Sequence, residues 1–243
     1  MRWKCGCSYD GTDYFGWQIQ SRQLSVQQAI EEALEGLFKE RLTIAGSGRT
    51  DAGVHALEQV FHFDFEWNHG PEKLLRAMRS IFPEAIRPLY VETVPDDFHA
   101  RFSAVSKRYE YRLHIGETSP FDARYCWSVQ RSIDLNAMNE ALSYFIGEYD
   151  FAAFAANRGK EYESTVRIMT QSDMTLEGAF LTFRFRANGF MYKMVRSLVG
   201  SLVNIGLGVD KPKAIGELLE SGERVPFVLV APANGLFLEK VFY

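Results

Sequence analysis

Residues 46–67 read GSGRTDAGVHALEQVFHFDFEW, a polar, glycine-rich segment that runs directly into an alternating one. Aromatic residues at positions 61, 63, 65 and 67 alternate with polar residues, and this period of two predicts a strand with one buried face. Asp51, within the glycine-rich part, has two open interpretations. It is either a loop-capping residue, a common role for aspartate beside glycine, or a working carboxylate.

The same periodicity analysis extends along the whole chain. It predicts helices over 25–38, 71–82, 134–147, 189–206 and 211–221, and strands over 2–9, 41–45, 61–67, 86–94, 109–115, 166–175, 179–187 and 235–243. Strands and helices mix in both halves. We therefore expect an α+β fold in which two α+β subdomains, residues 1–104 and 105–243, share one sheet.

Composition excludes several classes of protein. The 243 residues are 47% hydrophobic and 24% charged, which is typical of a globular protein, and the formal net charge is −4. A negative balance argues mildly against a nucleic-acid partner, although it says little about local patches. The three cysteines form no Cys-x-x-Cys pair, so we expect neither a disulfide framework nor a metal site.

The sequence also indicates a location. The first residues contain no apolar signal-peptide core, and the most apolar stretch, 190–209, is interrupted by Lys193, Arg196 and Asn204. We interpret that stretch as a buried amphipathic helix and expect a cytoplasmic protein. Arg196 then lies within an apolar helical run, where its guanidinium needs a carboxylate or carbonyl partners.

Three motifs bring these observations together. Residues 9–20 (YDGTDYFGWQIQ), 46–56 (GSGRTDAGVHA) and 188–202 (NGFMYKMVRSLVGSL) resemble, in order and spacing, the motifs of TruA-type tRNA pseudouridine synthases. Connecting segments such as VPDDFHARFSAVSKRYEY (94–111) resemble that family as well. The resemblance covers essentially the whole chain, and it implies two similar α/β subdomains that share a central, largely antiparallel mixed sheet flanked by helices.

The resemblance implies a reaction and a set of residues. Uridine in the anticodon stem-loop of tRNA, at positions 38, 39 and 40, would be isomerised to pseudouridine without a cofactor or metal, by a homodimer. Asp51 matches the catalytic aspartate, Tyr109 the active-site tyrosine and Arg196 the arginine that pairs with the aspartate. Arg49 matches an arginine that helps the target base to leave the stack. Three glycines would allow the loop to approach the ribose: Gly46, Gly48 and Gly53.

Other assignments stay open. Basic residues that are expected to contact phosphates, each of which is also an ordinary surface charge on its own, are Arg22, Lys107, Arg108, Arg158 and Lys160. The carboxylate has three chemical routes, namely attack at C1′, addition at C6, or removal of the 2′ proton. Two other functions remain as alternatives: a non-catalytic tRNA-binding or folding protein, and an aspartate-based nucleoside hydrolase.

Overall fold

The computed structural model describes residues 1–156 and 162–243. The chain divides into two compact units, which are described one at a time. The first comprises Met1–Val105 together with Phe237–Tyr243, and the second comprises Ser106–Leu236. The strand near residue 240 thus groups with the first unit. The two subdomains expected from the sequence, residues 1–104 and 105–243, remain a proposal.

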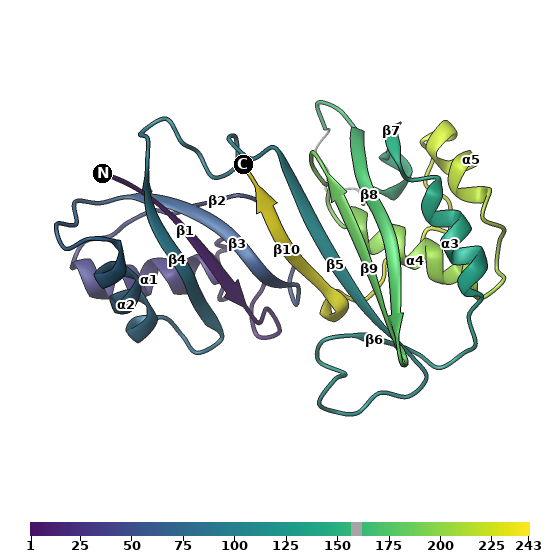
Figure 1. The fold of residues 1–243 in the computed structure, drawn as a ribbon, viewed down its shortest axis with the longest axis horizontal. Helices are drawn as coiled ribbons and strands as arrows, with labels where there is room; N and C mark the ends of the chain where they lie inside the picture. The colour runs from purple at the N-terminus through teal and green to yellow at the C-terminus, as the bar shows by residue number, and fades with distance from the viewer. Residues whose placement is uncertain (157–161) are drawn as a thin grey trace. The chain divides into compact units, whose positions relative to one another are not determined.

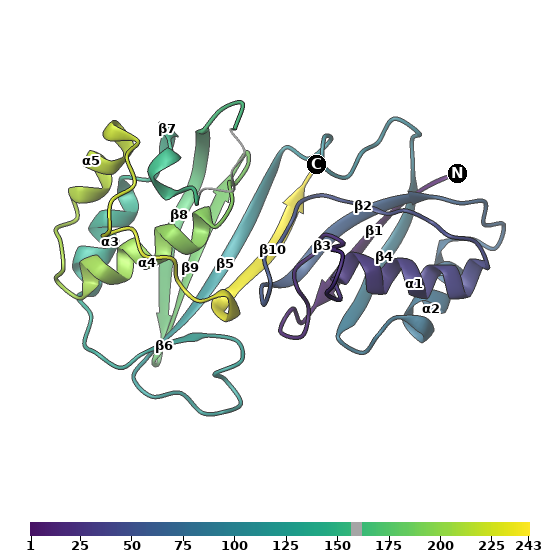
Figure 2. The same ribbon diagram turned by 180° about the vertical axis from the view of Figure 1, so that it is seen from behind.

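The first unit is a sheet with two helices on one face, as the view in Figure 2 shows for α1. Its strands run in the order β4-β1-β3-β10, and β2 pairs with β3. The β1 pairings with β3 and β4 are antiparallel, whereas β10 runs parallel to β3. Its elements are β1 (Arg2–Tyr9), α1 (Val26–Phe38), β2 (Ala45–Gly46), β3 (His55–Asp64), α2 (Pro71–Ile81), β4 (Ile86–Val94) and β10 (Leu236–Phe242).

Local sequence explains where α1 begins. Ser25 has extended backbone angles, and its side chain accepts a hydrogen bond from the Gln28 amide, which satisfies one of the free N–H groups of the first turn. Ile30 and Leu34 are fully buried on the face that packs against the sheet. The predicted strand over 41–45 was wrong. Only Ala45–Gly46 pairs, as β2, because the preceding residues follow the end of α1 without sheet partners.

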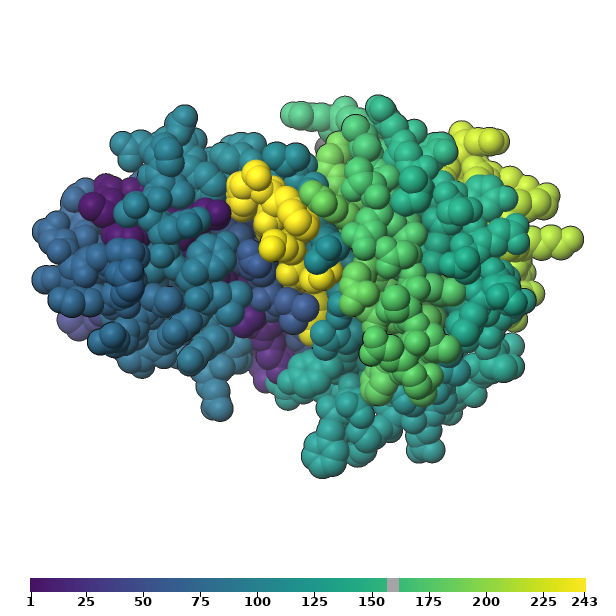
Figure 3. All heavy atoms as spheres, viewed as in Figure 1, coloured from purple at the N-terminus to yellow at the C-terminus, as the bar shows by residue number. Residues whose placement is uncertain are grey.

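The second unit is an antiparallel sheet in the order β5-β9-β8-β7, with β6 added parallel to β5. Its helices pack on one face, and the green atoms of β8 and β9 lie open at the surface on the other (Figures 1 and 3). Its elements are β5 (Ser106–Ile115), β6 (Trp127–Val129), α3 (Leu135–Ser143), β7 (Gly147–Asp150), η1 (Ala152–Phe154), β8 (Val166–Glu177), β9 (Phe180–Ala187), α4 (Met194–Gly206), α5 (Ala214–Ser221) and η2 (Ala233–Gly235).

Helix α4 begins five residues later than the sequence predicts. Lys193, at its N-cap, has φ of 57°, in the left-handed region, so the preceding residues cannot continue the helix backward. Nine of the 13 helix residues are apolar or glycine, and eleven are buried. Among the described residues, no helix is long and apolar enough to cross a membrane. With its strands mostly antiparallel and a few parallel pairings, the fold confirms the predicted α+β class.

Two helical glycines give a test of how tightly α4 packs. A Cβ added to Gly200 would lie 2.0 Å from the Leu229 carbonyl oxygen, whereas one added to Gly36 in α1 would meet nothing within 4 Å. We therefore expect Gly200→Ala to destabilise the protein by about 1–3 kcal/mol through overpacking. As the matched control, Gly36→Ala should stabilise it by about 0.5–1 kcal/mol. Urea unfolding measures both, and equal effects of the two substitutions would contradict the packing described for α4.

Candidate functional site

Asp51 lies in the segment between β2 and β3, and contacts on both sides hold its backbone. Before it, the buried Thr50 hydroxyl is 2.8 Å from the Tyr9 hydroxyl, and the Thr50 carbonyl accepts from the Trp17 amide at 3.1 Å. After it, the Asp51 carbonyl accepts from the Val54 amide at 3.1 Å, which closes a turn. The side chain of Asp51 is half-buried. A carboxylate is thus presented from a backbone that has little freedom to move.

Two glycines of the 9–20 motif make this arrangement possible. A Cβ at Gly11 would lie 2.0 Å from the Val54 carbonyl oxygen, and one at Gly16 would lie 2.4 Å from that of Thr50. Gly16 also has φ of +82°, a conformation that side chains rarely adopt. The 9–20 segment therefore packs directly against the backbone on either side of Asp51, which explains why both motifs occur in one chain.

A buried glutamine fixes the start of the loop. Gln59, on β3, donates from Nε2 to the Gly48 carbonyl at 3.0 Å and accepts from the Ser47 hydroxyl at 2.7 Å. It is fully buried, on the same strand face as Phe61 and Phe63. Sequence reasoning missed this residue. The signal that could have found it is a polar side chain at an apolar-face position, since buried polar groups need partners.

The other glycines of the loop differ in what they do. Gly53 has φ of 75°, so the turn after Asp51 uses its left-handed conformation. Gly46 faces the ring of Trp17, and an added Cβ would lie 2.4 Å from Trp17 Nε1. Its small size therefore allows a tryptophan that is 2% exposed to pack beneath the loop. This packing accounts for Gly46 without reference to a ligand.

His55 begins β3 and ties it to the 9–20 segment. The Gly11 amide donates to His55 Nδ1 at 3.1 Å, and the imidazole ring stacks on Phe237 with ring centroids 4.7 Å apart. The residue is 1% exposed. These contacts give His55 a structural role in holding the loop.

Arg49 and Arg22, the predicted RNA-contacting residues of the first unit, are both exposed. Arg49 precedes the buried Thr50 and donates from Nε to the Gln18 side-chain oxygen at 3.3 Å. Arg22 lies in the turn between residues 20 and 25, which is closed by an isolated bridge between Gln20 and Gln23. Of these two arginines, Arg49 therefore belongs to the same loop as Asp51, whereas Arg22 belongs to a different turn.

In the second unit, Tyr109 lies on β5 opposite Phe185 of β9 and is 7% exposed. The edge of its ring contacts Phe190, with centroids 5.0 Å apart and planes at 79°. Phe190 belongs to the segment that leads into α4. Tyr111, two residues along, is completely buried, and its hydroxyl donates to the Pro232 carbonyl at 2.9 Å. Burial raises the pKa of Tyr111, so the phenol is a neutral hydrogen-bond donor within the core.

Arg196 lies in the first turn of α4 and is half-buried. Its Nε donates to the Ala231 carbonyl at 2.7 Å, while the Ala231 amide donates to the Arg196 carbonyl at 3.0 Å. This pair of hydrogen bonds holds the Arg196 backbone and the Nε atom of its side chain in place. One of the partners expected from the sequence, a backbone carbonyl, is therefore present.

The basic residues expected to contact phosphates do not form a single patch on β5. Lys107 and Arg108 are consecutive on the strand, so their side chains point to opposite faces of the sheet. Lys107 shares the face of Tyr109, whereas Arg108 lies on the other face, directly opposite Arg186 of β9. Arg158 and Lys160 lie outside the described residues.

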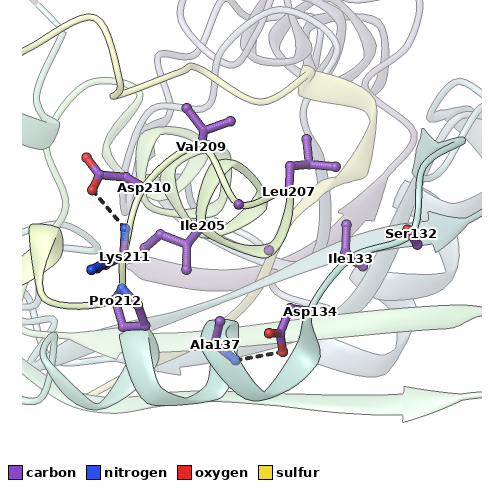
Figure 4. A pocket seen from close by; sticks show the side chains of 12 residues that line it. Ser132, Ile133, Asp134, Ala137, Ile205, Leu207, Val209, Asp210, Lys211 and Pro212 are labelled. Carbon is purple, nitrogen blue, oxygen red and sulfur yellow. Dashed lines mark hydrogen bonds between the residues drawn. The ribbon is translucent and has the colours of Figure 1, made fainter.

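A surface depression in the second unit contains none of the predicted residues (Figure 4). It lies between the start of α3 and the segment that follows α4. Asp134 accepts there from the amides of Asn136 and Ala137, and Asp210 from that of Lys211, so backbone groups engage both carboxylates. Within residues 1–156 and 162–243, no group of three or more His, Cys, Asp or Glu side chains gathers as metal ligands would.

Comparison with known proteins adds a family to this geometry. The family model described as tRNA pseudouridine synthase matches residues 7–103 and 141–243, which include the Asp51 loop and α4. The chain belongs to this family. The predicted family and its enzyme class, an isomerase that modifies tRNA, are confirmed.

Relatives of known name are similar over nearly their full length. The tRNA pseudouridine synthase A of Thermodesulfovibrio yellowstonii is 42% identical over 99% of this chain and 98% of its own. The tRNA pseudouridine synthase A 1 of Protochlamydia amoebophila is 40% identical over 99% of this chain and 96% of its own. A chain in the solved structure of the archaeal box H/ACA sRNP Nop10-Cbf5 complex aligns with a TM-score of 0.39 at 12% identity, over 83% of this chain and 44% of that chain.

A glycine substitution tests the contact between the 9–20 segment and the Asp51 loop of this synthase. Gly16→Ala combines a left-handed backbone with a collision at Thr50, so we expect a loss of about 1–3 kcal/mol in unfolding free energy and a displaced loop. Gly178, in the turn between β8 and β9, also has a positive φ, but a Cβ added there would meet nothing within 4 Å, so Gly178→Ala is the matched control. Urea unfolding followed by tryptophan fluorescence compares them. A Gly178 variant that is destabilised as much as the Gly16 variant would show that backbone strain alone accounts for the loss.

Proposed function

We propose that the protein converts uridine to pseudouridine in the anticodon stem-loop of tRNA, at positions 38, 39 and 40, with Asp51 as the catalytic group. The observation that carries the proposal is the fixed presentation of Asp51. Its backbone is held by Tyr9, Trp17 and Val54 contacts in a segment that the family model covers. The names of the similar proteins, tRNA pseudouridine synthase A, support tRNA as the substrate.

The reaction suits a single carboxylate. Isomerisation breaks the N1–C1′ glycosidic bond, turns the uracil and joins C5 to C1′, and the C5 proton is finally released. No outside group is transferred and no net oxidation occurs. Asp51 can add to C1′ or to C6, or can remove the 2′ proton to give a glycal. Each route begins with the same carboxylate lone pair, and the carboxylate is regenerated when pseudouridine forms.

Tyr109 and Arg196 are the proposed partners of Asp51. A carboxylate and a guanidinium can form two parallel hydrogen bonds, which would fix the direction of the acid. Tyr109 is proposed to stack on the uracil, a contact worth about 1–3 kcal/mol per base in single-stranded sites. The Arg196 Nε is held by the Ala231 carbonyl and the Tyr109 ring by Phe190, so both side chains are already ordered before RNA binds.

The target base must leave its stack before it can react. Unstacking and unpairing cost a few kcal/mol, and a residue that fills the vacated space can offset this cost. Arg49, exposed and two residues before Asp51, is proposed for that role. The same proposal includes phosphate contacts by Arg22, Lys107 and Arg108, and action as a homodimer in the cytoplasm.

An acid substitution tests the catalytic assignment. Asp51→Asn keeps the size of the side chain but removes the anionic lone pair. We expect release of tritium from tRNA that contains 5-tritiated uridine to fall by about 10²–10⁴-fold. Binding of the tRNA should persist, because the substitution leaves the proposed phosphate contacts in place.

Four outcomes separate the alternatives in that experiment. Tritium release without free uracil supports the synthase, and free uracil would indicate a nucleoside hydrolase. Full activity in the Asp51→Asn variant would refute the catalytic role of Asp51. Binding without tritium release by the wild type would leave a tRNA-binding or folding protein.

A second measurement tests which uridines of the tRNA are modified. With transcripts of an anticodon stem-loop that carry uridine at 38, 39 or 40 alone, we expect pseudouridine at each site. Transcripts with uridine only in the acceptor stem should stay unmodified. Mass spectrometry after cyanoethylation locates the product, and modification of the acceptor-stem transcript at an equal rate would contradict the proposed specificity.

A further inference from the structure

A line of side-chain amides connects helix α1 with Arg49. Gln18 donates from Nε2 to Gln27 Oε1 at 2.8 Å, and Gln27 donates from Nε2 to Glu31 Oε1 at 2.9 Å. At the outer end, Gln18 Oε1 accepts from Arg49 Nε at 3.3 Å. These four side chains, which we call the amide relay, come from the 9–20 motif, α1 and the Asp51 loop.

Fixed groups set the direction of the relay. The Glu31 carboxylate can only accept, and it also accepts from the Ile44 amide at 3.0 Å. Gln27 Nε2 is shared with the Ile44 carbonyl at 3.2 Å, and Gln27 Oε1 accepts from the Ile19 amide at 3.3 Å. Backbone groups therefore confirm which end of the Gln27 amide is oxygen. Gln18 must then turn its nitrogen inward and its oxygen toward Arg49.

Burial decreases along the relay from its base to its tip. Gln27 and Glu31 are 6% and 8% exposed, Gln18 is half-buried, and Arg49 is exposed. A hydrogen bond is held most firmly where water cannot compete for its partners. The buried base of the relay thus holds the outer amide in position for the exposed side chain of Arg49.

We propose that Gln18, oriented by Gln27 and Glu31, is a positioning residue for Arg49 during extrusion of the target base. This inference rests on the proposed function, because it takes the role of Arg49 from there. Arginine has five N–H donors, and the bond to Gln18 uses the one on Nε. The guanidinium is therefore restrained at its inner nitrogen. Within the part of the chain that the structure describes, its two outer nitrogens make no hydrogen bond, which leaves their donors for RNA.

Positioning of this kind makes a prediction that a general structural role does not. Extrusion is costly when the target base is paired and stacked, and it costs least when the base is already unpaired. Loss of Gln18 should therefore slow modification of a paired uridine and leave that of an unpaired uridine nearly unchanged. A displaced Asp51 loop would instead slow both reactions alike.

The experiment measures single-turnover tritium release on two stem-loops, one with the target uridine paired to adenine and one with an abasic site opposite it. We expect Gln18→Ala to slow the paired substrate about three- to tenfold, the value of one hydrogen bond. Gln20→Ala is the matched control. Gln20 lies in the same segment and bonds the Phe15 carbonyl at 2.8 Å, outside the relay.

A double substitution locates the effect. In an Arg49→Ala background, Gln18→Ala should cause no further slowing, because the side chain it positions is already absent. Equal slowing of both substrates by Gln18→Ala, or the same slowing with and without Arg49, would overturn the proposal.

A direct measure of extrusion separates this proposal from the proposed function. In the Asp51→Asn background, 2-aminopurine beside the target uridine reports unstacking by its fluorescence without any chemistry. Gln18→Ala should reduce the fluorescence rise on binding, and Arg49→Ala should reduce it as well. An unchanged rise in the Gln18 variant refutes the positioning role, whereas free uracil from the wild type refutes the synthase assignment alone.

Discussion

The close contact between two backbone segments is the constraint on which the first unit depends. Gly11 and Gly16 bring the 9–20 segment within van der Waals distance of the peptides on either side of Asp51. Any side chain at either glycine would separate the segments. Because the contact is between main chains, the direction of the Asp51 carboxylate is set by the fold and not by its own rotamer alone. The neighbouring hydrogen bonds from Trp17 and Tyr9 depend on the same approach.

Local signals in the sequence predict much of the secondary structure. Helix α1 follows from a capping residue and an apolar stripe, both of which act within a few residues of one another. The start of α4 could not be predicted in this way, since the left-handed Lys193 leaves no mark on the hydrophobic pattern. Strands β6 and β7, with three and four residues, are too short to show a period, and their pairing partners are distant in the chain.

The residues of the proposed site likewise separate into those that sequence motifs identify and those that only the tertiary structure reveals. Asp51, Tyr109 and Arg196 were named from motifs, and their assignment to catalysis stays a prediction. The carbonyl that holds Arg196 could not be predicted by spacing, because Ala231 reaches it only through tertiary folding. Gln59, which holds Gly48 at the start of the Asp51 loop, is marked in the sequence only as a polar residue on an apolar strand face. The strand period does predict that Lys107 and Arg108 face opposite ways, a consequence that a count of positive residues conceals.

The parallel pairing of β10 with β3 bears on how the protein is made. Phe237 and Leu238 pair with His55 and Ala56, and the Phe237 ring stacks on His55. On the ribosome, these residues emerge only after the whole second unit has been translated. More than a hundred further residues must therefore be synthesised before β10 can pair with the start of β3, directly after the segment that carries Asp51. During that interval the nascent first unit exposes the edge of β3 at His55 and Ala56, and the loop is held by the 9–20 segment and by Gln59 of β3.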